Sequence, residues 1–512
     1  MKRYIKTFLI GLTTIIFTGC EGFLTEIPES ALTSAEFYTT PIRINQGVIG
    51  CYNGMAIIQQ DEWMFTELRS DNTWQDGTGS SATARIDQTD VASFRTSPSL
   101  PLLQAYWYKT FQNISNINSV LPSVADNKYI AVETQRAQYE GELLFMRAYH
   151  YYTLVNLFGD MFKITKVIGP NEAKKINRSP VSEIYNEIII PDLTKAAAQA
   201  PATYVDAEKG RITKWAAKAM LAKVYMMIGG AQNLALAKTL LEEVMAAPKH
   251  KLLTGTGAYA SVFSVSNEMN DEIIFAIRYK GGSLGIGSTF WSNFAPLGSA
   301  NQFLKLGTPL GYNVPTHEID SLYLSNGNDN RKNVNYKIWV KSPTSSLAYI
   351  AKYMDAGMTQ ALQAENDWIV LRYADILLLY AEILSQDGNH AMAHSYVNQI
   401  RSRAGIADIG PFGSKIEALD AVYAERRLEL AFENQRWFDL LRMAKSYDNP
   451  NKPVEIMIKH TFVTDWVIAY SKYNPIQPPE QRFYIKERLI LPIPQTEIDT
   501  NNEIKIEQND TY

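Results

Sequence analysis

Two consecutive helix patterns in residues 213–247 constrain the fold most. Thr213 can cap a helix whose apolar residues recur every three or four positions, and Gly229 and Gly230 end it before a second helix of the same kind. The pair spans 35 residues, close to the roughly 34 residues of a tetratricopeptide (TPR) hairpin. A single helical hairpin cannot bury its apolar face alone. We therefore expect it to stack on further helices.

Other segments carry the same helical period. Residues 136–158 have two apolar stripes, which predicts a helix covered on two sides, and residues 367–384 and 391–403 predict a second hairpin. Residues 249–345 are rich in Gly, Ser, Asn and Pro, with a short strand pattern at 272–279. The prediction is a mostly α-helical, TPR-like scaffold with long irregular loops and a few short strands. The helical stripes also contain Trp107, Trp215 and Trp368, which we expect in the core.

The first twenty residues resemble an export signal. Three cations precede an apolar run at 7–17, which ends in Thr18, Gly19 and Cys20. The run is about half the length that spans a bilayer, and its cationic start is typical of a secretory signal. A small residue before Cys resembles a bacterial lipoprotein signal, which predicts removal of residues 1–19 and acylation of Cys20. An unlipidated signal with a chance cysteine is the alternative.

Charge and cysteine content exclude several classes of protein. The net charge is −4 and no block of five like charges occurs, whereas nucleic-acid binding needs a concentrated cationic face. Nucleic acid is therefore not an expected partner. The chain has only two cysteines, Cys20 and Cys51. If Cys20 is lipidated, no internal disulfide and no cysteine metal site can form.

Signals of catalysis and metal binding are weak. Residues 281–285 match G-x-S-x-G after a strand pattern, but no periodic helix follows, as a nucleophile elbow requires. His390 and His394 have the spacing of a metal-binding pair, but a solvated turn accounts for them equally. Asn326, Asn328 and Asp329 could bind calcium, but an ordinary turn rich in Asn and Asp accounts for these residues too. We expect no catalytic residue, no metal and no cofactor, with a structural calcium ion as the alternative.

Charged residues alternate in sign between positions 425 and 442. Glu425, Glu429 and Glu433 are interleaved with arginines, and four pairs of opposite charge lie three residues apart. The pairs are Arg426–Glu429, Glu433–Arg436, Arg436–Asp439 and Asp439–Arg442. We interpret them as an ion-pair ladder on one helix, a structural feature and not a set of catalytic carboxylates.

Several short sequence motifs follow one another along the chain in the order found in a known family. They are Phe23 and Leu24 after Cys20, RAYHYYTLVNLFGD at 147–160, Ser182, Tyr185 and Ile188 before Asp192, LRYADILL at 371–378, NQIRSRAG at 398–405, ERRLELAFE at 425–433 and RWFDLLR at 436–442. Together they resemble the SusD/RagB nutrient-binding lipoproteins. His150 replaces a more usual aromatic residue, and Met161 and Phe162 replace the usual Val-Pro.

The resemblance implies a lipid-anchored protein on the outer face of a Gram-negative outer membrane. It would capture an oligosaccharide or polysaccharide and deliver it, as a non-catalytic lid, to a SusC-like TonB-dependent transporter. Peptide uptake of the RagB kind is the first alternative, and a surface glycan hydrolase and a TPR-like protein-binding module are others. The implied organisation is a signal at 1–19, an N-terminal SusD-like region at 20–270 and a C-terminal region at 271–512, with a loop-rich insert at 271–365 and helices at 366–445.

A glycan site needs exposed aromatic rings beside amide, carboxylate or guanidinium groups. Two loop-rich regions offer this combination, and burial of the rings is the alternative in each. The candidate ligand contacts are Asp71, Asn72, Trp74 and Arg85 in the first region and Phe290, Trp291 and Tyr312 in the second.

Overall fold

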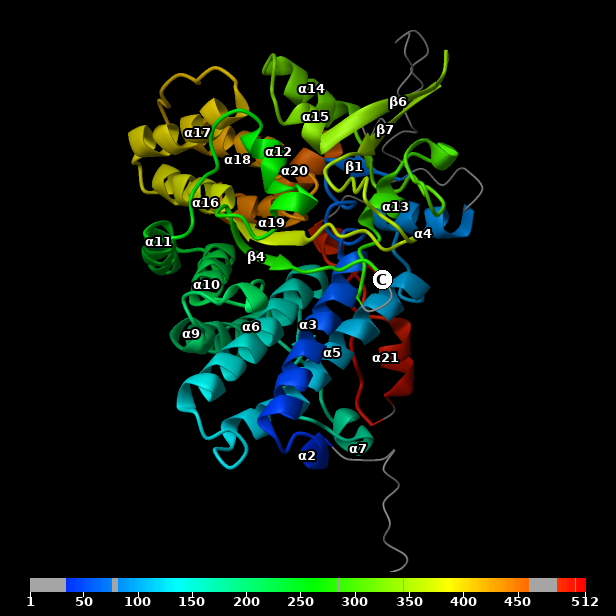
Figure 1. Ribbon diagram of the computed structural model, residues 1–512, viewed down its shortest axis with the longest axis vertical. Coiled ribbons are helices and arrows are strands. Elements are labelled where there is room, and N and C mark those ends of the chain that lie inside the picture. Colours follow the sequence, from blue (N-terminus) through cyan, green and yellow to red (C-terminus); the bar gives the residue numbers. More distant parts are fainter. Residues whose placement is uncertain (1–33, 76–81, 283–284, 344, 460–485, 502) are drawn as a thin grey trace, which may run out of the picture.

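The computed structural model describes residues 34–75, 82–282, 285–343, 345–459, 486–501 and 503–512. These residues are mostly helical, and their strands form four two-stranded antiparallel sheets, which are β1–β5, β2–β3, β4–β8 and β6–β7. The predicted fold class is confirmed. Helices lie throughout the molecule; those of residues 190–245 and 373–429 are at the left in Figure 1, whereas α13 (Phe290–Phe294) and the long β6–β7 hairpin are at the upper right. None of the helices in these ranges is long and apolar enough to cross a membrane.

The N-terminal helices are tightly packed. They are α2 (Ser34–Phe37), α3 (Pro41–Glu62), α4 (Ala82–Ala92), α5 (Pro101–Ala125) and α6 (Glu133–Phe158). Helix α3 crosses α5 at Gly54, where a Cβ atom would lie 2.1 Å from the Asn113 side-chain oxygen. Only glycine permits this approach. Helix α6 buries most of its circumference, as its two apolar stripes predicted.

The predicted hairpins form one continuous array of helices. It consists of α9 (Ile190–Gln199), α10 (Lys214–Ile228), α11 (Ala231–Met245), α16 (Tyr373–Gln386), α17 (His390–Ala404) and α18 (Lys415–Glu429). The Thr213 side chain accepts a hydrogen bond from the Ala216 amide, and Gly229 (φ 76°) ends α10, as expected. Helix α11 packs directly against α16. The two hairpins are therefore neighbours, although more than a hundred residues separate them in sequence.

One part of the second hairpin was predicted wrongly. Trp368–Arg372 is strand β8, which pairs with β4 (Ile273–Ile277), and α16 begins only at Tyr373. All five residues of β8 are buried. A short apolar run that is buried on both faces carries no period that separates strand from helix, so the helix was extended too far. The strand predicted at 272–279 is confirmed as β4.

The predicted ion-pair ladder is also wrong in its geometry. Helix α18 ends at Glu429, and α19 (Arg436–Ser446) begins after a turn in which Phe432 and Asn434 have positive φ angles of 66° and 59°. Of the four predicted pairs, only Asp439–Arg442 (2.8 Å) forms within the described structure. The interpretation as structural residues holds, but the contacts are buried and most of them join distant segments.

Arg372 lies at the centre of this buried network. It contacts Glu272 at 3.0 Å, Glu429 at 2.5 Å and Glu433 at 2.7 Å, and its side chain is 1% exposed. Glu429 also contacts Arg331 and Arg403. Each of these carboxylates is therefore neutralised by guanidinium groups, and the network joins the residue before β4, β8, α17, α18 and the turn after α18.

The remaining helices and strands connect the N-terminal helices with the helical array. They are β1 (Thr73–Trp74), β2 (Met161–Phe162), α7 (Pro170–Ala173), β3 (Arg178–Ser179), α8 (Val181–Ile184), α12 (Ala258–Val262), β5 (Val314–Pro315), α14 (His317–Ser325), α15 (Lys332–Asn335), β6 (Tyr336–Ser342), β7 (Ser345–Ile350), α20 (Lys452–Lys459) and α21 (Gln495–Thr500). Helix α8 continues into α9 through a π-helical turn at Tyr185–Ile189.

Candidate functional site

The two predicted loop regions meet in space. Strand β1 pairs with β5, so that Trp74 lies opposite Val314. The Thr73 hydroxyl donates a hydrogen bond to the side-chain oxygen of Asn313 over 2.6 Å. Regions more than two hundred residues apart in sequence therefore pack together, and α13 joins them through a hydrogen bond from the Tyr312 amide to the Asn293 carbonyl (Figure 1).

The aromatic rings of the two loop regions, which were predicted to be exposed, are buried. Trp74 is 4% exposed, Phe290 0%, Trp291 1% and Tyr312 9%. The expectation that these rings stand as exposed platforms is corrected by their burial, because the loops fold over their own apolar side chains to form a core. Direct ligand contact by these residues stays a prediction.

Asp71 and Asn72 are buried among arginines. The carboxylate of Asp71 accepts two hydrogen bonds from Arg436, at 2.7 and 2.8 Å, and Asn72 accepts one from Arg427 at 2.9 Å. These contacts attach the first loop region to α18 and α19, which gives both residues a structural role. Arg85 belongs to α4, and its side chain lies outside the described part of the structure.

The sequence analysis missed the exposed part of the aromatic cluster. Phe303 and Trp339 are half-buried, and their ring centroids lie 6.1 Å apart. Phe303 packs on the buried rings of Trp291 (6.3 Å) and Tyr349 (5.0 Å). We call Phe303 and Trp339 the hairpin platform. A signal for it exists in the sequence, because Lys337 precedes Trp339 at strand spacing and so shares its face, whereas the pairing becomes irregular between Val340 and Ser342.

Polar side chains surround the hairpin platform. The indole nitrogen of Trp339 donates a hydrogen bond to the side-chain oxygen of Gln302 over 2.9 Å. Asn301, Gln302 and Lys341 are exposed. The surface thus combines the flat rings with amide and ammonium groups, as a carbohydrate site requires.

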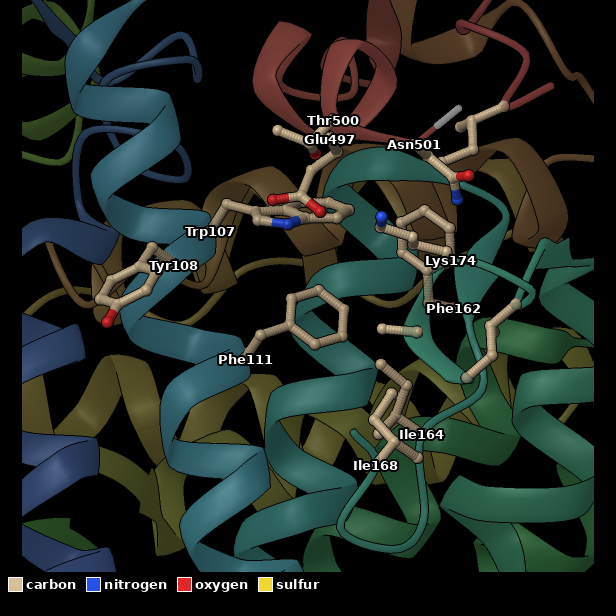
Figure 2. A pocket seen from close by; sticks show the side chains of 13 residues that line it. Trp107, Tyr108, Phe111, Phe162, Ile164, Ile168, Lys174, Glu497, Thr500 and Asn501 are labelled. Carbon is tan, nitrogen blue, oxygen red and sulfur yellow. The ribbon is translucent and has the colours of Figure 1, made fainter. Parts of the chain in front are cut away.

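A second aromatic hollow lies elsewhere, between α5, β2 and α21. This cavity of about 220 Å³ has apolar walls that include Trp107, Phe111 and Phe162, with Lys174 and Glu497 near them (Figure 2). Trp107 is 2% exposed, as its core assignment predicted, and yet one part of the ring faces this space. We call it the aromatic pocket. Trp368 is buried, as expected, whereas Trp215 is only half-buried, so its predicted place in the core is not confirmed.

The weak catalytic and metal signals gain no support from side-chain contacts. Asp329 contacts Arg331 at 2.7 Å, and the His394 ring contacts the Ile409 carbonyl at 2.7 Å. The described ranges contain no group of three or more His, Cys, Asp and Glu residues that could hold a metal ion. Ser283 of the G-x-S-x-G match and Cys20 lie outside them.

Burial raises the pKa of three carboxyl groups, Glu62, Glu67 and Asp367, to about 7, and Glu62 lies beside a small cavity. Burial outweighs the hydrogen bonds from Tyr149 and Gln59, which only partly oppose the rise in the pKa of Glu62. The cavity beside it has a volume of about 30 Å³, which suffices for one or two water molecules. A sugar ring does not fit there.

Comparison with known proteins covers both halves of the chain. A model described as "Starch-binding associating with outer membrane" matches residues 22–226, and a model described as "SusD family" matches residues 323–512. SusD-like protein P25 of Formosa agariphila is 26% identical over 497 residues, covering 85% of this chain and 89% of that protein. A SusD-like protein of Bacteroides ovatus is 24% identical over 470 residues, covering 85% and 82%.

Solved structures share the fold across the whole molecule. A SusD-like protein from Bacteroides fragilis superposes with a TM-score of 0.73 at 22% identity, covering 94% of this chain and 99% of that one. Surface glycan-binding protein A from Bacteroides fluxus superposes with a TM-score of 0.73 at 21% sequence identity, covering 92% of this chain and 99% of that one. A laminarin-binding SusD-like protein superposes with a TM-score of 0.70 at 23% sequence identity, covering 93% of this chain and 100% of that one. With matches in both halves of the sequence and this shared architecture, the chain belongs to the SusD/RagB family.

Proposed function

We propose that this protein is a non-catalytic, lipid-anchored glycan-binding protein of the outer membrane, and that it passes captured oligosaccharide to a SusC-like TonB-dependent transporter. The observation that carries the proposal is family membership, because the model matched by residues 22–226 is described as starch-binding and as associating with the outer membrane. Two structural relatives are described as laminarin-binding and as surface glycan-binding.

The hairpin platform is the proposed place of glycan contact. A sugar ring presents an apolar C–H face that packs on an aromatic ring, while its hydroxyl groups need polar partners. Phe303 and Trp339 supply the rings, and Gln302 supplies an amide group beside them. Of the buried candidates, Trp291 then acts indirectly, since its ring packs against Phe303.

Anchoring and delivery complete the proposed role. Acylation of Cys20 would hold the protein at the membrane without a spanning helix. Capture, closure over the transporter and release are then population shifts that ligand contacts drive. Replacement of Cys20 by serine should release the protein from the outer membrane, and a TonB-dependent barrel should co-purify with the wild-type protein from native membranes. Retention of the serine variant, or purification without a barrel, would contradict the respective part.

Affinity electrophoresis tests glycan capture directly. The full chain should be retarded in gels that contain a matching polysaccharide, with laminarin and starch tested first. Trp339→Ala and Phe303→Ala should weaken retardation, whereas Trp215→Ala is the matched control, because Trp215 is half-buried on α10 beneath Lys214 and Lys218. Equal retardation of all variants would move the contact away from the hairpin platform. Binding of peptides alone, or release of reducing ends from the polysaccharide, would overturn the proposed function.

A further inference from the structure

The aromatic pocket is built by segments from opposite ends of the chain. Trp107 and Phe111 come from consecutive turns of α5, Phe162 comes from β2, and Glu497 comes from α21. Lys174 follows the short helix α7 directly. Four separate segments therefore converge on one cavity, which lies apart from the β6–β7 hairpin (Figures 1 and 2).

Three rings form the apolar side of this pocket. The centroids of Trp107 and Phe111 are 4.9 Å apart, and Phe162 lies 6.1 Å from Trp107 and 6.4 Å from Phe111. The rings are inclined to one another by 45° to 87°. Phe111 is half-buried, so that its free surface faces the pocket space.

Polar groups of both charges stand beside these rings. The Glu497 carboxylate and the Lys174 ammonium lie near the Trp107 indole, with Asn501 next to them (Figure 2). Burial raises the pKa of Glu497, and a hydrogen bond from the Trp107 side chain partly opposes this rise. Lys174 forms no ion pair with another described residue. A hydrogen-bond acceptor and a donor thus flank the rings, while the formal charge of the pair is zero.

The geometry points to a second carbohydrate site: we propose that the aromatic pocket binds one neutral sugar ring, separately from the hairpin platform. A volume of about 220 Å³ is below the roughly 300–1,000 Å³ of typical small-molecule sites, which selects a single ring. The aromatic walls suit its C–H face, and the carboxylate, amide and ammonium suit its hydroxyl groups. The balanced charge disfavours an anion or a cation.

The proposal goes beyond the proposed function, because it names another site and a smaller ligand. The test titrates methyl glycosides of common hexoses into the full chain, purified in a detergent without a sugar headgroup, and follows them by saturation-transfer NMR and calorimetry. Wild-type protein should bind at least one glycoside. Phe111→Ala and Glu497→Gln should each weaken this binding about tenfold or more, whereas Glu503→Gln should not change it, because this exposed carboxylate near α21 does not line the pocket.

The outcomes separate the two proposals. Absence of glycoside binding to wild-type protein that still captures a polysaccharide in the gel would overturn the second site and leave the proposed function intact. Unchanged glycoside affinity in both Phe111→Ala and Glu497→Gln would also overturn it, since the first variant alters the aromatic side of the pocket and the second alters its polar groups. Binding of free amino acids in preference to glycosides would overturn the ligand class. Circular dichroism checks that each variant is folded.

Discussion

The α10–α11 hairpin and the junction between α18 and α19 stabilise the same helical array by opposite means. In the hairpin, Ala219, Ala237 and Leu241 are fully buried, and the helices pack through apolar side chains. At the junction, Arg372 and Glu429 are just as deeply buried, but they are charged. The first region relies on the removal of apolar surface from water, and the second relies on complete pairing of charges.

This difference determines how each region tolerates change. Apolar packing loses stability in proportion to the atoms removed and the cavity that remains. A buried ionic network loses more stability per substitution, because removal of one partner leaves an uncompensated charge in a medium of low dielectric constant. We therefore expect the junction to be the more sensitive region, although ion pairs are not in general the stronger source of stability.

The largest effect is expected for Arg372→Met. Methionine keeps much of the side-chain volume but leaves Glu272, Glu429 and Glu433 without one of their guanidinium partners. The free energy of unfolding should fall by about 3–5 kcal/mol, measured by chemical denaturation at pH 7. Lys505→Ala removes a cation from an exposed pair, with side chains 82% and 70% exposed, and should cost less than about 1 kcal/mol. A similar small loss in both variants would refute the sensitivity of the junction.

The apolar region should respond next most strongly, through Leu241→Ala. Leu241 is fully buried between α10 and its neighbours, so the substitution should cost about 3 kcal/mol. Leu236→Ala is a matched control on the same helix, because Leu236 is 43% exposed and its loss should cost about 0.5 kcal/mol or less. Equal losses for the two leucines would mean that α11 is not packed as described.

The same contrast explains how much of the fold could be predicted. The apolar period of α10 and α11, the Thr213 cap and the Gly229 stop are local signals, and each was confirmed. At the junction, the alternation of Glu and Arg looks like a solvated helix face. The partners of these charged residues come from positions as distant as Asp71 and Arg331. No local pattern reveals that such charges are buried, and none marks the break after Glu429.

The site was harder to predict for a related reason. The sequence identified the loop regions, and β1–β5 pairing brings them together. It could not show which rings remain exposed, because Trp291 is covered by Phe303 and Tyr349, which lie in other segments. Exposure is a property of the assembled surface. The aromatic pocket was equally hidden, since Trp107 and Glu497 are almost four hundred residues apart in the sequence.

A pH titration should separate buried carboxyl groups of the two kinds. Burial raises the pKa of Glu429, but Arg403, Arg372 and Arg331 outweigh this and hold it well below its usual range. Its contribution to stability is therefore present above the unfolded pKa of about 4.3 and lost in stronger acid. Glu62, with hydrogen bonds but no guanidinium partner, has a pKa raised to about 7. Its contribution is complete below the unfolded pKa and is lost as the pH rises through about 7.

Glu62→Gln tests this assignment. Between pH 5 and pH 8, the stability of wild-type protein relative to Glu62→Gln should fall by on the order of 2 kcal/mol, because glutamine carries no ionisable group. Denaturation curves at both pH values provide the measurement. Glu503→Gln is the control, because Glu503 is exposed. A constant difference between wild type and Glu62→Gln across this range would show that Glu62 titrates normally.

The smallest effect should be alike in the two regions, because helix capping does not depend on what the helix buries. The Thr213 side chain accepts from the Ala216 amide at 3.3 Å, and the Ser414 side chain accepts from the Glu417 amide at 3.2 Å. Replacement of either residue by alanine leaves one amide at a helix start unsatisfied and should cost about 1 kcal/mol. Thermal denaturation of Thr213→Ala and Ser414→Ala should therefore give similar shifts. A much larger loss for Ser414→Ala would mean that the ionic junction amplifies local fraying of α18, and the two regions would then differ in cooperativity as well as in the chemistry of their cores.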